Sequence, residues 1–337
     1  MASPIRLRET RPLKILLVTQ TYDTWVERDV AILREEHDVR VVSVLSTRDL
    51  LGVYKNMPWC DIVFSWFGKF PAFHAVLLSR LLGKRAVVVS GGDDAASVPE
   101  IRYGMYYYWW KRWCPSFVFR SADLVLSVSE CNRLETTRNS GVDPSKVKLL
   151  YHGFEPDKLL ASPKINKEEM VLTVGGVDWE RVRRKGYEGF VRSALHLPKA
   201  EFVLVGEWCD SSVHYLQALA PPNVRFTGGV STPDLMSWFG RSKVYVQASL
   251  HEGFGCTVAE AMLCECVPVV SRRTSLPEVV GDCGFYVDDL RPQEIAAQIQ
   301  RALASDLGQR ARERILIEFP FQRRKEGLLR AIADLGN

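Results

Sequence analysis

A strand, a glycine-containing turn, a helix and a second strand follow one another in residues 243–271, KVYVQASLHEGFGCTVAEAMLCECVPVVS. The apolar runs Lys243–Ala248 and Val267–Ser271 are continuous rather than alternating, which is typical of strands buried on both faces of a sheet. A helix from Thr257 through Cys264 fits between them. Strands joined through a helix are predicted to be parallel, with a right-handed crossover.

The same alternation of strand and helix patterns runs along most of the chain. It stops at His152–Glu169, a proline-containing polar stretch that we predict to be a linker. We therefore predict an α/β fold of two doubly wound, Rossmann-like domains facing across a cleft, residues 1–155 and 156–320, and a terminal helix over 321–337 that could return to the first domain. The other expected strands are Lys14–Thr19, Val39–Leu45, Asp61–Ser65, Arg85–Val89, Asp123–Val128, Met170–Val174, Glu201–Val205, Val224–Phe226 and Gly284–Val287.

Composition excludes several classes of protein. The net charge of +4 on 337 residues is far from that of a nucleic-acid-binding domain, so no nucleic-acid partner is expected. We find no apolar run of the roughly 20 residues needed to span a bilayer and no signal-peptide core. The eight cysteines form no CxxC pair, which favours buried thiols in a reducing compartment. We expect a cytoplasmic protein that at most lies on a membrane surface.

The turn inside residues 243–271 has features of a ligand site. Gly253 and Gly255 allow the backbone to turn tightly and to approach a ligand closely. The helix that follows presents N–H groups and a positive dipole end, which suit a phosphate, and Glu252 and Glu260 could accept hydrogen bonds from hydroxyl groups. The alternative is structural, because Thr257-x-x-Glu260 also fits a plain capping box.

A second candidate loop follows the expected strand Met170–Val174. The sequence Arg181-Val-Arg-Arg-Lys-Gly186 places four cations within five residues, and a bound diphosphate would offset their repulsion. The alternative is a solvated basic loop balanced by Glu180 and Glu188. Both candidate loops follow strands of the second predicted sheet, so we expect them at one edge and at one site.

Residues 252–288 also carry a family pattern. The segments EGFGCTVAEAM, VPVVS, SLPEVVG and GFYVD occur there in the order found in retaining GT-B glycosyltransferases of family GT4, whose E-x7-E element Glu252 and Glu260 resemble. The resemblance, weaker elsewhere, implies a GT-B fold and metal-independent transfer of a sugar, with retention, to a glycan or lipid-linked acceptor. It implies a nucleoside-diphosphate sugar as donor, UDP or GDP more than others, and no cofactor.

The resemblance also implies roles for individual residues. Residues 1–155 would hold the acceptor and 156–320 the donor. Glu252 would contact the donor sugar, Lys185 with Arg184 would neutralise the departing diphosphate, and Glu260 would bind the ribose. The remaining expected donor-binding residues are Gly253, Phe254, Gly255, Cys256, Thr257, Gly176, Phe226 and Asp93.

The chain departs from the family pattern at three places. Gly176 stands where the family commonly has arginine, and of the nearby Arg181, Arg183 and Arg184 we favour Arg184 as the substitute. Gln20–Thr24 replaces a glycine-rich loop, and Ser90–Asp93 replaces a His-Gly pair. Two alternatives therefore stay open: a GT-B nucleotide-sugar epimerase, and a non-catalytic partner of another transferase.

The aromatic segment 102–120, RYGMYYYWWKRWCPSFVFR, is the last feature. Aromatic rings beside Lys111 and Arg112 suit peripheral contact with a membrane. The alternative is an amphipathic helix that packs within the protein or against a partner.

Overall fold

The computed structural model describes residues 11–155 and 166–336, and its residue contacts divide the chain into two units. The first unit takes in the described residues up to Ser97, together with Gly104–Tyr151 and the C-terminal stretch from Gln322. The second consists of Val98–Tyr103 and the described residues of His152–Phe321. Most of the predicted linker, residues 156–165, lies outside the described residues.

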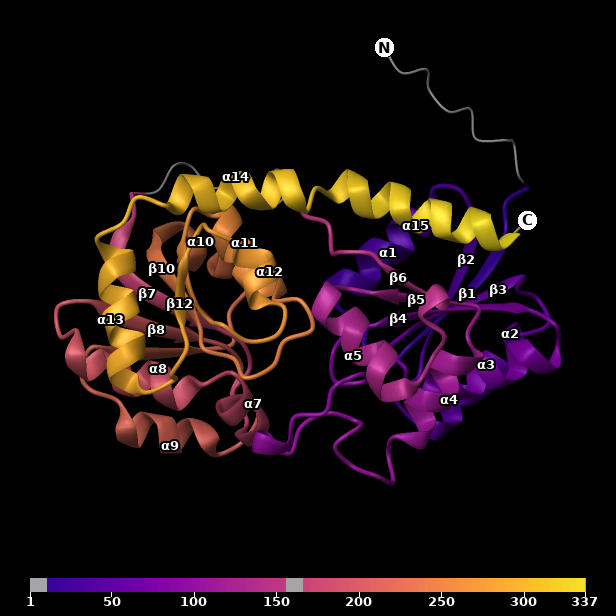
Figure 1. Cartoon of the computed structure of the whole chain (residues 1–337), viewed down its shortest axis with the longest axis horizontal. Helices are drawn as coiled ribbons and strands as arrows, with labels where there is room; N and C mark the ends of the chain where they lie inside the picture. Colours follow the sequence, from indigo (N-terminus) through magenta and orange to yellow (C-terminus); the bar gives the residue numbers. More distant parts are fainter. Residues whose placement is uncertain (1–10, 156–165, 337) are drawn as a thin grey trace, which may run out of the picture. The chain divides into compact units, whose positions relative to one another are not determined.

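The first unit is built on a six-stranded parallel sheet with the strand order β2-β1-β3-β4-β5-β6 (Figure 1). Its central strands are buried along their whole length, as the continuous apolar runs predict. The strands are β1 (Lys14–Thr19), β2 (Asp38–Ser43), β3 (Ile62–Trp66), β4 (Arg85–Ser90), β5 (Leu124–Ser127) and β6 (Val147–Leu149).

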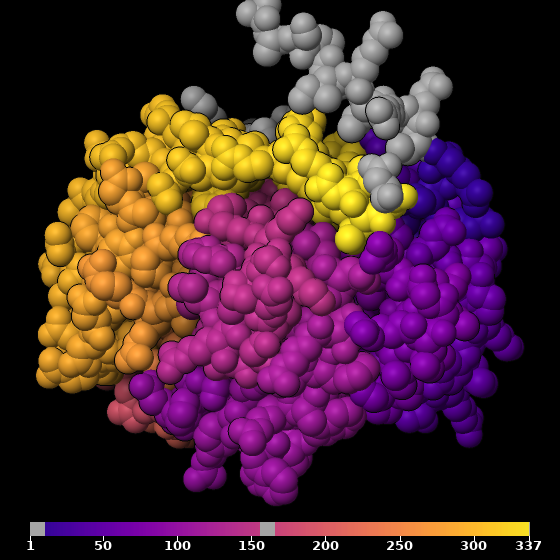
Figure 2. Space-filling view, turned by 45° about the vertical axis from the view of Figure 1, so that its right-hand side comes forward, coloured from indigo at the N-terminus to yellow at the C-terminus, as the bar shows by residue number. Residues whose placement is uncertain are grey.

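Helices cover both faces of this sheet. On one face α2, α3 and α4 bury apolar side chains against β1, β3, β4 and β5. On the other face α1 and α15 meet the strand residue Trp66, and Figure 2 shows the outer side of α15, in yellow, open at the surface. The helices are α1 (Thr24–Arg34), α2 (Leu50–Asn56), α3 (Phe70–Leu81), α4 (Trp113–Ser121), α5 (Glu130–Ser140) and α15 (Phe321–Gly336), with 3-10 turns at Thr47–Asp49 and Pro144–Lys146.

The second unit has its own six-stranded parallel sheet, with the strand order β12-β11-β10-β7-β8-β9 (Figure 1). The chain builds outward from β7 through β8 to β9 and then returns to add β10 on the other side of β7. The strand order therefore reverses between β7 and β10. The strands are β7 (Glu168–Val174), β8 (Glu201–Val205), β9 (Val224–Gly228), β10 (Ser242–Gln247), β11 (Val267–Ser271) and β12 (Phe285–Val287).

The main core of the second unit lies between this sheet and helices α8 and α13. Phe190 on α8 and Ile295 on α13 pack there against inward-facing strand residues such as Phe202 and Val244. The helices are α7 (Trp179–Arg184), α8 (Tyr187–Ser193), α9 (Ser212–Leu219), α10 (Thr232–Arg241), α11 (Cys256–Leu263), α12 (Leu276–Val280), α13 (Pro292–Leu303) and α14 (Gly308–Glu318), with 3-10 turns at Pro99–Ile101 and Ala194–His196.

The prediction of two doubly wound parallel sheets is confirmed, and each expected strand is present within two residues of its predicted ends. Strand β6 is additional. It has only three residues, and the polar Lys148 interrupts the apolar run that would have indicated it.

Two predicted assignments differ from the structure. The segment 98–103, placed by the sequence in the first domain, groups with the second unit. Within the aromatic segment only residues 113–120 are α-helical, as part of α4, which buries Val118 and Phe119 in the core of the first unit, so the amphipathic-helix alternative holds for these residues alone. Arg102 and Gly104, with φ of 54° and 94°, turn the chain on either side of Tyr103.

A buried ion pair fastens α15 to the first unit. Arg324 donates to both carboxylate oxygens of Asp29 on α1, at 2.8 and 2.7 Å, and also to the carbonyl oxygens of Leu150 and Tyr151. The Trp66 indole N–H donates to the same carboxylate at 3.1 Å. Only 4% of the Arg324 side chain and none of Asp29 is exposed. The C-terminal helix is thus held by a specific polar network as well as by Leu328 and Ile332.

The chain offers no obvious membrane span: within residues 11–155 and 166–336, the helices are all too short or too polar to cross a bilayer.

Removing the Asp29 carboxylate should destabilise the first unit strongly. Asp29→Ala leaves the buried Arg324 charge without its partner, which costs about 3–5 kcal/mol. Glu168→Gln is the matched control, because its pair with Arg241 is partly exposed and worth about 1 kcal/mol or less. Urea unfolding followed by tryptophan fluorescence measures both. Equal losses for the two variants would contradict the prediction.

Candidate functional site

The site of interest lies at the carboxyl edge of the second sheet, where the strand order reverses between β7 and β10. Open parallel sheets bind ligands at such a switch point. The loop after β7 carries the basic stretch that includes Arg184 and Lys185, and the loop after β10 carries Ser249–Gly255. The two candidate loops of the sequence therefore flank one switch point.

Glycines let the loops after β7, β8 and β10 approach one another closely with their backbones. A Cβ on Gly206 would lie 1.9 Å from the carbonyl oxygen of Gly175, and one on Gly186 would lie 2.4 Å from that of Ala248. Neither position accepts a larger residue without moving the backbone. The Leu250 N–H donates to the Arg184 carbonyl oxygen at 2.7 Å, which ties the basic loop to the end of β10.

Glu252 is the centre of the site. Its Oε1 accepts a hydrogen bond from Ser249 Oγ at 2.9 Å and lies 3.4 Å from both Arg184 Nη1 and Lys185 Nζ. The three charged side chains are 13–14% exposed, so the cluster is largely shielded from water yet remains accessible. The structure thus brings together the three residues that the sequence grouped as Glu252, Lys185 and Arg184.

The backbone of Glu252 is fixed from the neighbouring loop after β11. Its N–H donates to Thr274 Oγ1 at 3.1 Å, and its carbonyl oxygen accepts from Ser275 Oγ at 3.0 Å. Ser275 also donates to the Phe254 carbonyl oxygen at 2.9 Å. The sequence analysis missed Ser249, Thr274 and Ser275. Their positions directly after strands were visible, but hydroxyl residues are common in such loops.

The electrostatics keep Glu252 ionised. Burial by itself would raise its pKa, but Lys185 and Arg184, with the hydrogen bond from Ser249, lower the pKa from 4.5 to about 2. Burial would lower the pKa of Arg184, and Glu252 outweighs this and raises it. The cluster therefore holds two cations and one carboxylate, and Glu180 adds a second carboxylate at 2.8 Å from Arg184 Nε on its exposed side.

The helix after Glu252 begins one residue earlier than expected. Gly255, with φ of 99°, precedes Cys256, the first residue of α11. Thr257 is therefore inside the helix, and the capping-box interpretation of Thr257 and Glu260 is wrong. The N-cap residue, Gly255, has no side chain that could cap the helix, and the positive end of the helix dipole suits an anion. Glu260 lies farther along α11 and is half-buried.

The three arginines that could replace the arginine common in the family occupy different positions in the structure. Arg181 lies beside Gly176, with its Nη1 3.2 Å from where a Cβ would be, and it pairs with Asp178. Arg184 instead lies against Glu252, and Arg183 is exposed. Phe226 lies on β9, partly buried against the main core of the second unit.

Asp93 belongs to the first unit, where it forms an ion pair with Lys69 at 2.7 Å. The neighbouring Asp94 is fully buried and accepts N–H groups from Gly68, Gly91 and Gly92 at 2.8–3.1 Å. Burial, with the nearby Asp93 charge, raises the pKa of Asp94 to about 6. Asp94 thus ties the loops after β3 and β4 together.

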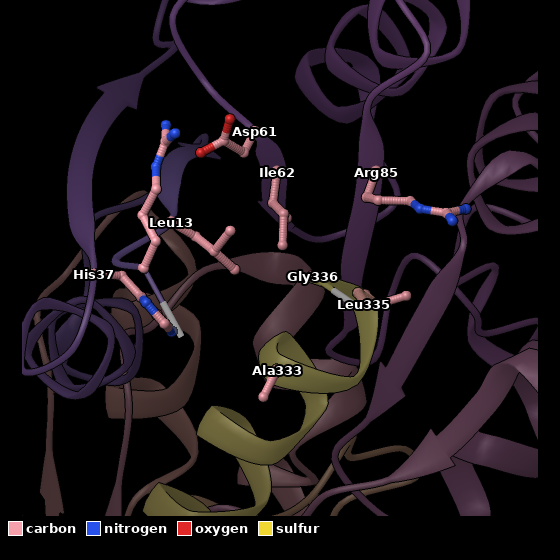
Figure 3. Close-up of a pocket in the computed structure, with 9 residues that line it drawn as sticks. Leu13, His37, Asp61, Ile62, Arg85, Ala333, Leu335 and Gly336 are labelled. Carbon is pink, nitrogen blue, oxygen red and sulfur yellow. The ribbon is translucent and has the colours of Figure 1, made fainter. Parts of the chain in front are cut away.

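The first unit has a cavity at the amino-terminal edge of its own sheet. Residues at the starts of β1, β3 and β4 and the end of α15 line it, among them Leu13, Asp61, Arg85 and Ala333 (Figure 3). Ligands of open parallel sheets bind at the carboxyl edge, so this cavity is not the candidate site. Across residues 11–155 and 166–336 we found no group of three or more His, Cys, Asp or Glu side chains arranged to hold a metal ion.

Comparisons with known proteins agree with this geometry. Residues 168–305 match the family model described as "Glycosyl transferases group 1", a range that contains both loops of the site. The chain is 28% identical over 205 residues to the O-antigen chain mannosyltransferase B of Escherichia coli, covering 55% of this chain and 53% of that protein. It thus spans about half the length of that relative. It is 26% identical to the alpha-galactosylglucosyldiacylglycerol synthase of Streptococcus pneumoniae, covering 79% and 76% of the two chains.

Solved structures share the fold. The crystal structure of Anabaena Alr3699/HepE in complex with UDP and glucose superposes with a TM-score of 0.78 at 17% identity, covering 96% of this chain and 100% of that one. A glycosyltransferase from Rickettsia africae superposes with a TM-score of 0.76 at 16% identity, over 97% and 99% of the chains. The predicted GT-B fold is thereby confirmed.

The low pKa of Glu252 should make the free energy of unfolding depend on pH. A folded-state pKa of about 2, below the ordinary 4.5, means that the ionised carboxylate stabilises the fold above about pH 4.5 and that this stabilisation is lost as the pH falls toward 2. A depression of that size corresponds to roughly 3 kcal/mol. Glu252→Gln should therefore unfold at lower urea than wild type near neutral pH, with a smaller difference at about pH 3.5.

Glu207→Gln is the control, because Glu207 is an exposed residue in the loop after β8. Its difference from wild type should stay small at each pH. A Glu252→Gln deficit that is the same near neutral pH and at about pH 3.5 would contradict the assigned ion cluster.

Proposed function

We propose that this chain transfers a sugar from a nucleoside-diphosphate sugar to a glycan or lipid-linked acceptor, because residues 168–305 match the family model described as "Glycosyl transferases group 1". The proposal includes retention of configuration at the sugar carbon and independence from a metal ion. The observation that carries it is the cluster of Glu252, Arg184 and Lys185 at the switch point of the second sheet.

The charges of the cluster suit a diphosphate. Arg184 and Lys185 bring two positive charges to a site that is 13–14% exposed, and Glu252 balances one of them. The other carboxylate on Arg184, Glu180, is 58% exposed, so an incoming diphosphate could still pair with the shielded cations, and the positive end of the α11 dipole favours an anion as well. The cations also stabilise the negative charge that grows on the diphosphate as it leaves, which is the main catalytic contribution we assign to them.

The proposed reaction needs no side-chain nucleophile. The bond between the sugar carbon and the diphosphate oxygen breaks while the acceptor oxygen bonds to the same face of that carbon. The acceptor proton passes to the departing phosphate oxygen, so charge and atoms balance. Glu252, held by two cations with a pKa of about 2, is a poor base and instead accepts hydrogen bonds from sugar hydroxyls.

The donor nucleotide is proposed to be UDP or GDP. HepE of Anabaena was solved with UDP and glucose, and several relatives are named mannosyltransferases. Glu260 on α11 would accept hydrogen bonds from the ribose hydroxyls, one turn beyond the helix start that meets the diphosphate. We keep Gly253, Phe254, Cys256, Thr257 and Phe226 as lining residues of this donor site.

The acceptor is proposed to be presented at a membrane surface. Relatives are named for a diacylglycerol product and for a diphospho-undecaprenol substrate. In the first unit, Trp109, Trp110 and Trp113 are 74%, 53% and 54% exposed, unusually high for tryptophan. Lys111 lies over the Tyr108 ring beside them. Exposed aromatic rings next to cations match the interface of an anionic bilayer.

Nucleotide binding tests the donor half of the proposal. UDP or GDP should raise the melting temperature of the purified chain, since a ligand that binds only the folded state stabilises it by about 2.7 kcal/mol at 100 times its Kd. Lys185→Ala should weaken that binding roughly 10- to 100-fold, as expected for a lost hydrogen bond to a charged group.

Lys199→Ala, which removes an exposed lysine of the same unit, is the control and should bind as wild type does. If UDP, GDP and ADP all leave the melting temperature of the wild-type chain unchanged, the donor assignment fails.

Vesicle binding tests the membrane part. The chain should sediment with vesicles that contain anionic phospholipid, and exchange of Trp109 and Trp110 for serine should reduce the bound fraction while leaving nucleotide affinity unchanged. Equal sedimentation of wild type and variant would reject the aromatic surface as the contact.

A further inference from the structure

The loop Val98–Tyr103 comes from the N-terminal half of the sequence but belongs to the second unit. The residues on either side, Ser97 and Gly104, group with the first unit. An antiparallel bridge closes the loop, with the Val98 N–H donating to the Tyr103 carbonyl oxygen at 2.9 Å and the reverse bond at 3.1 Å. Between these ends, a 3-10 turn begins at Pro99. The loop is therefore a locally defined element rather than a loose connection.

This loop contacts the basic side of the candidate site. The Arg184 guanidinium carbon lies 5.1 Å from the centre of the Tyr103 ring. The same ring lies 5.4 Å from the His251 ring, which immediately precedes Glu252. Glu100 reaches Arg273, in the loop after β11, at 3.6 Å. Two residues of the loop thus meet the loops that hold Glu252.

The Tyr103 ring helps to orient the Arg184 guanidinium, which the polar contacts of Arg184 with Glu252 and His251 do only weakly. Nη1 of Arg184 reaches Glu252 Oε1 and the His251 carbonyl oxygen only at 3.4 Å, which is long for a charged hydrogen bond. Its one short contact, Nε to Glu180, is on a carboxylate that is 58% exposed. A guanidinium with weak directional bonds gains orientation from an aromatic face, which contributes about 0.5–2 kcal/mol.

We propose that Tyr103 is a positioning residue of the donor site, which holds the Arg184 guanidinium in the place where it meets the donor diphosphate. The proposal rests on the proposed function for the identity of the ligand. Tyr103 acts through Arg184, so its removal should weaken binding of the diphosphate group and leave the nucleoside part of the site unchanged. The flat ring is the required feature, which makes phenylalanine an adequate replacement.

The test uses the full chain and measures Kd for UDP, GDP and uridine by calorimetry in wild type, Tyr103→Leu and Tyr103→Phe. Tyr103→Leu should weaken binding of the diphosphate roughly 2- to 30-fold. Tyr103→Phe should stay within about 2-fold of wild type, because it keeps the ring face. Uridine affinity should not change. Glu100→Gln, which alters the same loop through an exposed pair, should also bind as wild type does.

A double-mutant cycle links the effect to Arg184. In an Arg184→Met background, Tyr103→Leu should add no further loss of diphosphate affinity. Unchanged affinity of Tyr103→Leu, or the same loss in both backgrounds, would overturn the proposal while the proposed function stands.

The same cycle read by urea unfolding needs no ligand. Suppose that the wild-type chain binds no nucleotide, so that the proposed function is rejected. Non-additive shifts of the unfolding midpoint would then still support the role of Tyr103 in holding Arg184. Additive shifts would reject that role as well.

Discussion

A carboxylate that is largely removed from water must be paired, and in the second unit that requirement falls on Glu252. Its charge holds Arg184 and Lys185 at the switch point between β7 and β10. Taking the three groups out of water is costly, and the cost is offset only when the geometry is held by surrounding hydrogen bonds. Ser249, Thr274 and Ser275 supply those bonds from the loops after β10 and β11. The loops after three strands thus meet at one residue, two through the ionised side chain of Glu252 and the third through its backbone.

The site still suits an anion after this pairing. Two shielded cations face one shielded carboxylate, Glu252, and one exposed carboxylate, Glu180, and the start of α11 adds the positive end of a helix dipole. Such a surface suits an anion more than a neutral ligand. The arrangement explains how a nucleoside diphosphate could be held by protein groups, with the cations stabilising the charge that develops on departure.

The first unit uses buried charge differently. Asp29 and Arg324 join two helices on one face of the sheet, and Asp94 joins two loops by accepting three backbone N–H groups. Both carboxylates are saturated by partners inside the protein, so neither is available to a ligand. The surface of this unit instead exposes Trp109, Trp110 and Trp113, the residues through which we propose contact with a membrane.

The sequence by itself determined the parallel sheets, because runs such as Val267–Val270 are apolar at every position and can be satisfied only by burial on both faces. It also determined that the two charged loops share an edge, since parallel strands end together. It favoured Arg184, but it could not show that Arg184 rather than Arg181 or Arg183 contacts Glu252, because the three arginines are equivalent in charge and are separated only by the turn of α7. Nor could it show that α11 begins at Cys256, or that Tyr103 lies on Arg184 across 81 positions of sequence. Those contacts depend on where distant loops converge, and only the tertiary structure decides that.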